Sequence, residues 1–205
     1  MLPGVDTGDP ESTPADAAPL GLGGLSARLL SIEAAAALEA HGSKTAGVLV
    51  PVADVERHPS IVFTERRRDL SRHPGEISFP GGRPEDGEDL LSTALRESQE
   101  EIGLEPTDVT VAGALPPVST VVTGYKVSPF VGVIPPDSRL QANPAEVERI
   151  LELEIEALRD GFEMRRLVRR GIPFRTPTYT VEDDLIWGAT ARILHDLLER
   201  LEGLA

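Results

Sequence analysis

Three neighbouring glutamates, Glu97, Glu100 and Glu101, have the side-chain type and the spacing that could bind a metal ion. In a helix, residues three and four apart lie on one side, so the three carboxylates would face the same way. Like charges this close repel one another, and a hard divalent cation with oxygen ligands, Mg²⁺ or Mn²⁺, would offset the repulsion. A solvated acidic helix face is the alternative. Two glycines that precede this segment favour the metal site.

The stretch from Phe79 to Leu104 contains the elements that would position these carboxylates. Phe79-Pro80-Gly81-Gly82 is typical of a strand that ends in a turn, and its glycines let the backbone approach a ligand or an ion closely. Asp86 is the predicted N-cap of a helix that Gly103 ends. Two acidic residues would lie in its first turn, where the helix dipole favours anions: Glu88 and Asp89.

Apolar residues at helical spacing predict the buried side of this helix and leave the three glutamates on the opposite side. The predicted buried residues are Leu91, Ala94, Leu95, Ser98 and Ile102.

The order of these residues resembles the Nudix box of the nucleoside-diphosphate-linked-X hydrolases. Gly82 is followed after five residues by Glu88, after seven more by Arg96-Glu97, after two by Glu100-Glu101 and after one by Gly103-Leu104. Ser98 departs from the pattern, which has a bulky aliphatic residue there. The resemblance implies an α/β (α+β) Nudix fold, in which a mixed β-sheet is sandwiched between α-helices.

A second segment resembles the motif of the coenzyme A pyrophosphatases within this family. It comprises Phe63-Thr64-x-Arg66, Gly75 and Phe79-Pro80-Gly81-Gly82. Arg67 and Ser71 depart from that branch, which has a small residue and an arginine at these positions. Further segments resemble the same branch, so that the resemblance covers the chain from about residue 25 to its end: Tyr125, Val127, Pro129-Phe130, Asn143-Pro144-x-Glu146-Val147 and Ile186-Trp187-Gly188-x-Thr190-Ala191.

The resemblance implies that coenzyme A or an acyl derivative is cut at its pyrophosphate, giving 3′,5′-ADP and a 4′-phosphopantetheine fragment. Glu97, Glu101, Glu100 and the Gly82 carbonyl are the implied metal ligands. Catalytic roles are expected for four residues: Arg96 orients Glu97, Glu88 orients the turn, and Glu100 or Glu146 acts as general base. The alternatives are another nucleotide substrate, namely ADP-ribose, a dinucleotide or a nucleoside triphosphate, and a nucleotide-binding module without turnover.

A short basic segment before the glycine turn is unusual in so acidic a chain. Guanidinium groups bind phosphate oxygens, so the substrate is expected to contact Arg66, Arg67 and Arg72, together with the Gly81 backbone. The alternative for any one of these arginines is a solvated loop with surface ion pairs.

The composition sets limits on the function. The net charge of −14 argues against nonspecific nucleic-acid binding, which depends on Lys and Arg. The absence of cysteine removes disulfides and thiolate chemistry and fits a cytoplasmic location. No apolar run approaches the length of a membrane span. A small-molecule nucleotide substrate and a homodimer are expected from the resemblance.

The rest of the chain is expected to form one domain. Residues 1–24 have the composition of a disordered tail, and residues 25–205 would form the Nudix domain. A helix is predicted over 25–41, broken near Ser31, and strand or helix both fit 145–158. Residues 160–170 are predicted to be irregular or helical. Strands are predicted over 47–52, 60–64, 109–115, 125–134 and 179–181, and a last helix over 187–201.

Overall fold

The computed structural model describes residues 21–53, 58–69, 74–120, 124–169 and 172–202. Within these ranges, the strands form an eight-stranded sheet and a three-stranded sheet. The helices are α1 (Leu22–Ser26), α2 (Ile32–Ala36), α3 (Leu90–Ile102), the 3-10 helix η1 (Pro106–Asp108), α4 (Ile155–Asp160) and α5 (Gly188–Arg200). The strands are β1 (Lys44–Ala53), β2 (Ser60–Arg66), β3 (Ile77–Ser78), β4 (Gly81–Gly82), β5 (Thr110–Ala114), β6 (Val118–Ser119), β7 (Tyr125–Ile134), β8 (Val147–Glu154), β9 (Phe162–Arg169), β10 (Ile172–Val181) and β11 (Asp184–Ile186).

The larger sheet is mixed and has the order β3-β2-β1-β7-β5. Its centre is the parallel pair β1 and β7, which runs from Lys44 beside Tyr125 to Ala53 beside Ile134. The other pairings in this sheet are antiparallel, including β4 with β1 and β8 with β2. Strands that are covered on both faces read as nearly continuous apolar runs, which explains the sequence of β1.

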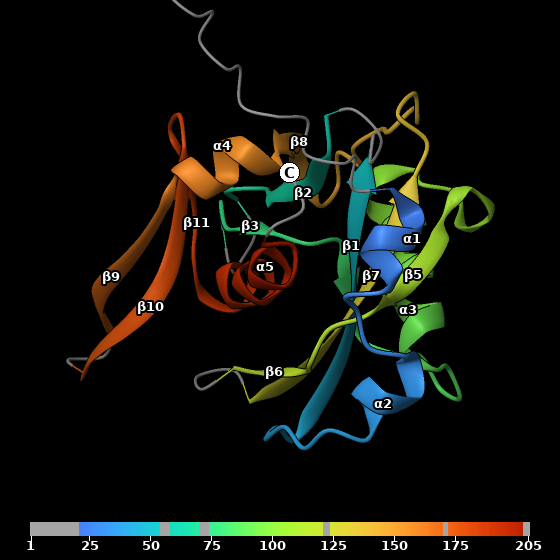
Figure 1. Cartoon of the computed structure of the whole chain (residues 1–205), viewed down its shortest axis with the longest axis horizontal. Coiled ribbons are helices and arrows are strands. Elements are labelled where there is room, and N and C mark those ends of the chain that lie inside the picture. The colour runs from blue at the N-terminus through green and yellow to red at the C-terminus, as the bar shows by residue number, and fades with distance from the viewer. Residues whose placement is uncertain (1–20, 54–57, 70–73, 121–123, 170–171, 203–205) are drawn as a thin grey trace, which may run out of the picture.

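Alternating residues of β1 point to opposite faces of the sheet and enter separate cores. Leu49 packs in the core beneath α3, whereas Val50 and Val52 pack in the core that includes α5. Figure 1 shows α3 on one side of β1 and β7, and α5 with β9–β11 on the other. The predicted fold class, a mixed sheet between helices, is therefore confirmed, and the three-stranded sheet is an addition that the sequence did not predict.

The break predicted near Ser31 separates two short helices. The Ser31 hydroxyl accepts a hydrogen bond from the Ala34 N–H at 3.1 Å and caps α2, which ends at Ala36 rather than near residue 41. Most of the predicted tail, residues 1–20, lies outside the described residues, and α1 begins at Leu22, inside the range expected to be tail.

The prediction for residues 160–170 was wrong, because Phe162–Arg169 is strand β9. It pairs with β10, which is longer than the predicted 179–181. The strand pattern was hidden because the alternation breaks: Arg165 and Arg166 follow each other, and so do Leu167 and Val168. For residues 145–158, where strand and helix both fitted the sequence, the structure has both: strand β8 is followed by helix α4. No helix in the described part of the chain is long and apolar enough to cross a membrane.

Candidate active site

The glycine turn is held against the central strand. Residues Gly81–Gly82 pair with β1, and the Leu49 N–H donates a hydrogen bond to the Pro80 carbonyl at 2.9 Å. Gly81 has a φ of +152°, and a Cβ there would lie 2.6 Å from the Val48 Cα. Only glycine fits this close approach of two backbones.

The second glycine of the turn lies against Glu97. A Cβ at Gly82 would overlap the Glu97 carboxylate, so the lack of a side chain lets this carboxylate reach the backbone. Burial raises the pKa of Glu97 above its usual value, although Arg96 acts in the opposite direction. The Glu97 carboxylate is therefore partly buried against the turn and does not lie on a solvated helix face.

Helix α3 begins later than predicted. Its N-cap is Asp89, whose carboxylate accepts hydrogen bonds from the N–H groups of Leu91 and Ser92, both at 3.0 Å. The prediction of Asp86 was wrong because a turn with Gly87 at a φ of +83° separates Asp86 from the helix. Glu88 accordingly precedes the helix, whereas Gly103, with a φ of +67°, ends it as predicted.

Glu101 is buried, although its position in the pattern indicated the polar face. Its residue is 5 % exposed. The carboxylate accepts a hydrogen bond from the Gly81 N–H at 3.3 Å, and Arg66 Nη1 lies 3.7 Å away. Burial raises the pKa of Glu101 to about 8, while Arg66 opposes this rise and the charges of Glu97 and Glu146 add to it. The buried carboxylate is thus only partly neutralised by its described neighbours.

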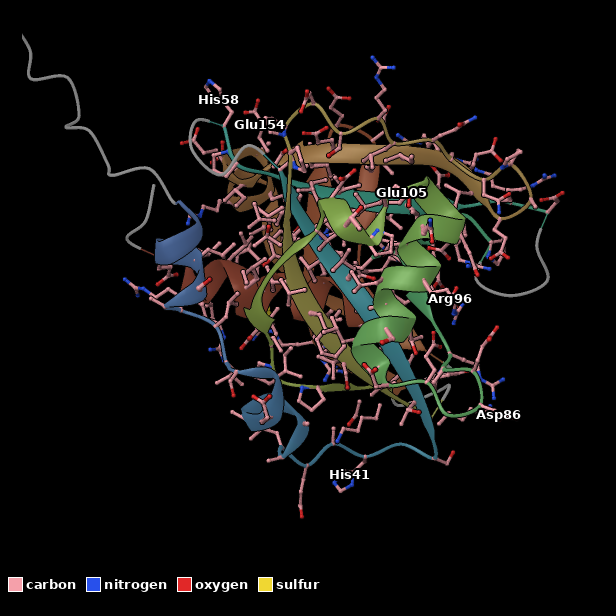
Figure 2. The ribbon with its side chains drawn as sticks, turned by 90° about the vertical axis from the view of Figure 1, so that its right-hand side faces the viewer. His41, His58, Asp86, Arg96, Glu105 and Glu154 are labelled. Carbon is pink, nitrogen blue, oxygen red and sulfur yellow. The ribbon has the colours of Figure 1, made fainter. Side chains whose placement is uncertain are left out.

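Arg96 connects three of the predicted acidic residues. Its guanidinium contacts Glu88 at 2.9 Å, Glu97 at 3.1 Å and Glu100 at 3.1 Å. It also donates to the Arg83 carbonyl at 3.2 Å, which ties the helix to the turn. Its hydrogen bond lowers the pKa of Glu88 to about 2. Figure 2 shows Arg96 on α3, between the loop that carries Asp86 and the far end near Glu105.

The loop that carries Glu146 packs on the end of α3. The Asn143 N–H donates to the Glu101 carbonyl at 2.9 Å. Glu146 is exposed, but its charge raises the pKa of both Glu97 and Glu101, so it faces the same site. The Arg67 N–H donates to the Glu146 carbonyl at 3.1 Å. This loop therefore brings a further carboxylate near the two on the helix.

The arginines predicted to contact phosphates have different surroundings. Arg66 lies beside Glu101. The Arg67 guanidinium is already engaged, because it contacts Asp69 at 2.6 Å and donates to the Pro144 carbonyl. Arg72 lies outside the described residues, so its predicted contact stays a prediction.

The donors at this site suit a hard divalent cation, because they are all carboxylate or carbonyl oxygens. Among the described residues, no three Asp, Glu or His side chains are gathered as a finished metal cage. Glu97 and Glu101 nevertheless approach the same turn, at Gly82 and Gly81 respectively. A buried carboxylate with incomplete compensation is costly, and a cation would reduce that cost. The arrangement therefore fits a cation held by Glu97 and Glu101, and the Gly82 carbonyl stays a predicted ligand.

Sequence reasoning missed two structural partners of this site. Glu65 is buried next to Arg66 and binds Arg149 Nε at 2.6 Å. Arg149 also contacts Asp184 of β11, which joins the two sheets. These partners are far apart in the sequence, so no local pattern predicts them. The strand predicted over 60–64 ends before Glu65, so the burial of this glutamate in β2 was not expected.

Comparison with known proteins identifies a family and several relatives with similar amino-acid sequences. The model of the NUDIX domain family matches residues 43–170. A protein of Citrobacter koseri, described as the uncharacterized Nudix hydrolase NudL, is 40% identical over 157 residues, which cover 75% of this chain and 81% of that protein. NudL of Cronobacter sakazakii is 41% identical over 158 residues, with the same coverage.

Two solved structures share the fold at low identity. The NUDIX domain of Shewanella oneidensis NrtR, in complex with ADP ribose, matches with a TM-score of 0.54 at 14% identity, over 81% of this chain and 92% of that one. A MutT/nudix family protein from Enterococcus faecalis matches with a TM-score of 0.51 at 14% identity, over 80% of this chain and 64% of that one. At this identity the two structures support the architecture alone.

Proposed function

Because this chain belongs to the Nudix hydrolase family, we propose that it cleaves the pyrophosphate bond of coenzyme A or an acyl-CoA, with Mg²⁺ or Mn²⁺ as cofactor. The products are 3′,5′-ADP and 4′-phosphopantetheine or its acyl form. Hydrolysis of a nucleotide diphosphate follows from the family, and the choice of coenzyme A is the finer part of the proposal.

The observation that carries the proposal is the meeting of two sequence motifs at Glu101. The box contributes Glu101 itself, and the segment that resembles coenzyme A pyrophosphatases contributes the two described groups that stabilise its negative charge, Arg66 and the Gly81 N–H. The upstream segment is also one packed unit, since the rings of Phe63 and Phe79 stack at 4.9 Å. The residues that distinguish this branch therefore surround the proposed metal ligand.

The roles of the carboxylates follow from their surroundings. Glu97 and Glu101 would hold the metal, with Gly82 and Glu100 as further ligands. A divalent cation at this point neutralises phosphate charge and makes a bound water more acidic. Arg96 holds Glu97 in place and fixes the turn through Glu88 and the Arg83 carbonyl.

Two residues are candidates for the general base, which takes a proton from the attacking water. Glu100 is exposed but bound to Arg96, and Glu146 is exposed on the loop beside the site. The variants Glu100→Gln and Glu146→Gln separate the two: at saturating metal, loss of the base lowers kcat, and the other substitution leaves kcat near the wild-type value.

On the substrate side, Arg66 would bind a phosphate beside the metal, and the Gly81 backbone would lie along the substrate. Arg72 is proposed as a second phosphate contact. Arg67 is proposed to act from the loop, since its guanidinium is engaged with Asp69 and Pro144. A cytoplasmic location is proposed on the cysteine-free composition.

Product analysis with coenzyme A and Mn²⁺ tests the reaction, the substrate and the metal requirement together. We expect 3′,5′-ADP and 4′-phosphopantetheine, and no products when a chelator is present. Glu97→Gln and Glu101→Gln should each lower turnover roughly a hundredfold or more while the far-UV spectrum stays unchanged. The matched control is Glu105→Gln, beyond the end of α3, which should keep full activity. Near-normal activity in either site variant would refute the assignment.

A substrate panel tests the finer part of the proposal. ADP-ribose, a dinucleotide and a nucleoside triphosphate are compared with coenzyme A under the same metal conditions. A coenzyme A rate below that of the others would reject the coenzyme A assignment and keep the hydrolase. Binding of a nucleotide without turnover under any metal would reject both, in favour of a binding module.

A further inference from the structure

Arg66, the residue proposed to bind a substrate phosphate, is held loosely at its side chain. Its Nη1 lies 3.7 Å from the Glu101 carboxylate, which is too long for a hydrogen bond. Among the described residues, its guanidinium makes no other ion pair. The donors of Arg66 therefore stay available to a phosphate, and the direction of the side chain depends on the backbone that carries it.

That backbone lies where strand β2 ends, because Arg66 is the last residue of the strand. The Arg66 N–H donates to the Glu76 carbonyl, and the Arg66 carbonyl accepts from the Gly75 N–H, both at 3.0 Å. The pairing of β2 with β8 shifts its register between Glu65 and Arg66, so the regular ladder is interrupted there. The placement of Arg66 therefore depends on how firmly Glu65 is held.

Glu65 is held by ion pairs on the other face of the sheet. Successive side chains of a strand point to opposite faces, so Arg66 reaches towards α3, and Glu65 reaches towards the three-stranded sheet (Figure 1). Glu65 is 4% exposed, and its carboxylate binds Arg149 Nε at 2.6 Å. The Arg149 guanidinium also binds the Asp184 carboxylate of β11, through Nη1 at 3.1 Å and through Nη2. One guanidinium thus joins the end of β2 to the second sheet.

The Arg149 guanidinium fixes direction as well as distance. A guanidinium is planar, and its N–H donors form a rigid fork, so two carboxylates bound to it keep a defined orientation. Strand β11 is itself anchored, because Ile186 packs in the same core as the stacked phenylalanine rings of the upstream segment. Asp184 therefore gives Arg149 a firm attachment, and Arg149 passes it to Glu65.

Stability alone is a weak reason for this arrangement. A buried ion pair gains little stability over apolar residues of similar volume, because both charges lose their hydration. Arg68 also contacts Glu65, at 3.3 Å, but its side chain is 81% exposed, and such pairs contribute little. Arg149 is therefore the main partner of Glu65, at a point directly behind Arg66.

Given that Arg66 binds a substrate phosphate, as proposed above, we propose that Arg149 and Asp184 are positioning residues for this contact. They hold Glu65 from the far face of the sheet and so fix the end of β2 from which Arg66 reaches the metal site. The three-stranded sheet, which carries Asp184, thereby contributes to substrate affinity. A phosphate contact that is equally strong in the ground state and the transition state acts on KM and not on kcat. Loss of the positioning should therefore appear in KM.

A double-variant cycle tests the proposal. Steady-state kinetics are measured with Mn²⁺ and whichever nucleotide of the substrate panel is turned over. Arg149→Gln should raise KM roughly tenfold and leave kcat within about twofold of the wild-type value. Arg66→Ala should raise KM at least as much. In the double variant, Arg149→Gln should add no further rise, because no phosphate contact is left to position.

The matched control is Arg165→Gln. Arg165 Nε binds Glu163 at the same 2.6 Å, on β9 of the three-stranded sheet, so this variant removes a similar ion pair away from Arg66 and should leave KM unchanged. Asp184→Asn is the second variant, and it carries the test if Arg149→Gln does not fold. It leaves Glu65 paired with Arg149 and should raise KM roughly threefold, again only when Arg66 is present. A kcat near the wild-type value shows that a variant is folded.

Two results would overturn the positioning role. One is an equal rise in KM from Arg149→Gln with and without Arg66, and the other is an unchanged KM in both Arg149→Gln and Asp184→Asn. If Arg66→Ala itself leaves KM unchanged, the proposed phosphate contact is wrong, and the positioning role is wrong with it. The identity of the reaction is decided separately, by product analysis.

Discussion

At the scale of single residues, the carboxylates of α3 differ although their sequence pattern treats them alike. Glu101 is buried, Glu97 lies against the Gly82 backbone, and Glu100 is exposed and bound to Arg96. The sequence predicted the three as one group, because spacing fixes the side of the helix and not the depth. Depth depends on β4 and on the 143–147 loop, which the helix sequence does not encode.

Gly82→Ala tests how closely the turn must approach Glu97. The added methyl group would overlap the Glu97 carboxylate and displace a proposed metal ligand. We expect kcat to fall roughly a hundredfold, since small misplacements in a site carry large costs. Gly24→Ala is the control, because a Cβ there meets nothing within 4 Å. Equal activities of the two variants in a product-release assay would contradict the predicted role of the contact.

Arg67→Ala distinguishes a substrate contact from a loop contact. Arg67 holds the loop of Glu146 through the Pro144 carbonyl, so its loss should lower kcat roughly tenfold and leave KM nearly unchanged. Arg68→Ala is the control, because Arg68 is highly exposed and contacts Glu65. Steady-state kinetics decide the matter: a raised KM with an unchanged kcat would assign Arg67 to the substrate instead.

At the scale of elements, the box predicts α3 well except at its start. Gly103 ends the helix as expected, but the N-cap is Asp89 and not the predicted Asp86. The choice depends on the left-handed Gly87 between them, which a pattern of cap residues does not include. A local pattern also failed at β9, because consecutive arginines at 165 and 166 interrupt the alternation of apolar and charged residues that marks a strand.

Substitution of the two aspartates separates the caps. Asp89→Ala removes the acceptor for the N–H groups of Leu91 and Ser92 and should lower the free energy of unfolding by about 1 kcal/mol. Asp86→Ala should change it little, because Asp86 lies outside the helix. Urea unfolding of both variants measures the difference. A larger loss in Asp86→Ala would contradict the cap assignment.

At the scale of the whole molecule, the fold class was predictable because several core segments each carry a clear apolar pattern of their own. Strands β1 and β7 are apolar along most of their lengths, and α5 (Gly188–Arg200) lies within the helix predicted over 187–201. The second sheet was not predictable, since its link to the first runs through Arg149 between Glu65 and Asp184, which are distant in the sequence.

The buried carboxylate makes the stability of the molecule depend on pH. Burial raises the pKa of Glu101 to about 8, above its value in the unfolded chain. Between these two pKa values the folded state holds a proton that the unfolded state has released, so this contribution to stability is full at low pH and is lost as pH rises through about 8.

Urea unfolding with a chelator present should therefore show that the wild-type chain loses more stability between pH 6 and pH 9 than Glu101→Gln does. Added Mn²⁺ should stabilise the wild-type chain more at the higher pH, because protons no longer compete for the carboxylate. Parallel pH dependence of the two proteins would contradict the assignment of this effect to Glu101.

The parallel pairing of β1 with β7 also bears on how the chain reaches its active form. Lys44 pairs with Tyr125, and the turn, helix α3 and strand β2 all lie in the connection between the two strands. Pairings between distant segments form slowly, because the chain must first close a long loop. Glu97 and Glu101 are thus aligned with the turn only once this closure is complete. During refolding, enzymatic activity should return with the last kinetic phase, after most helical structure has formed.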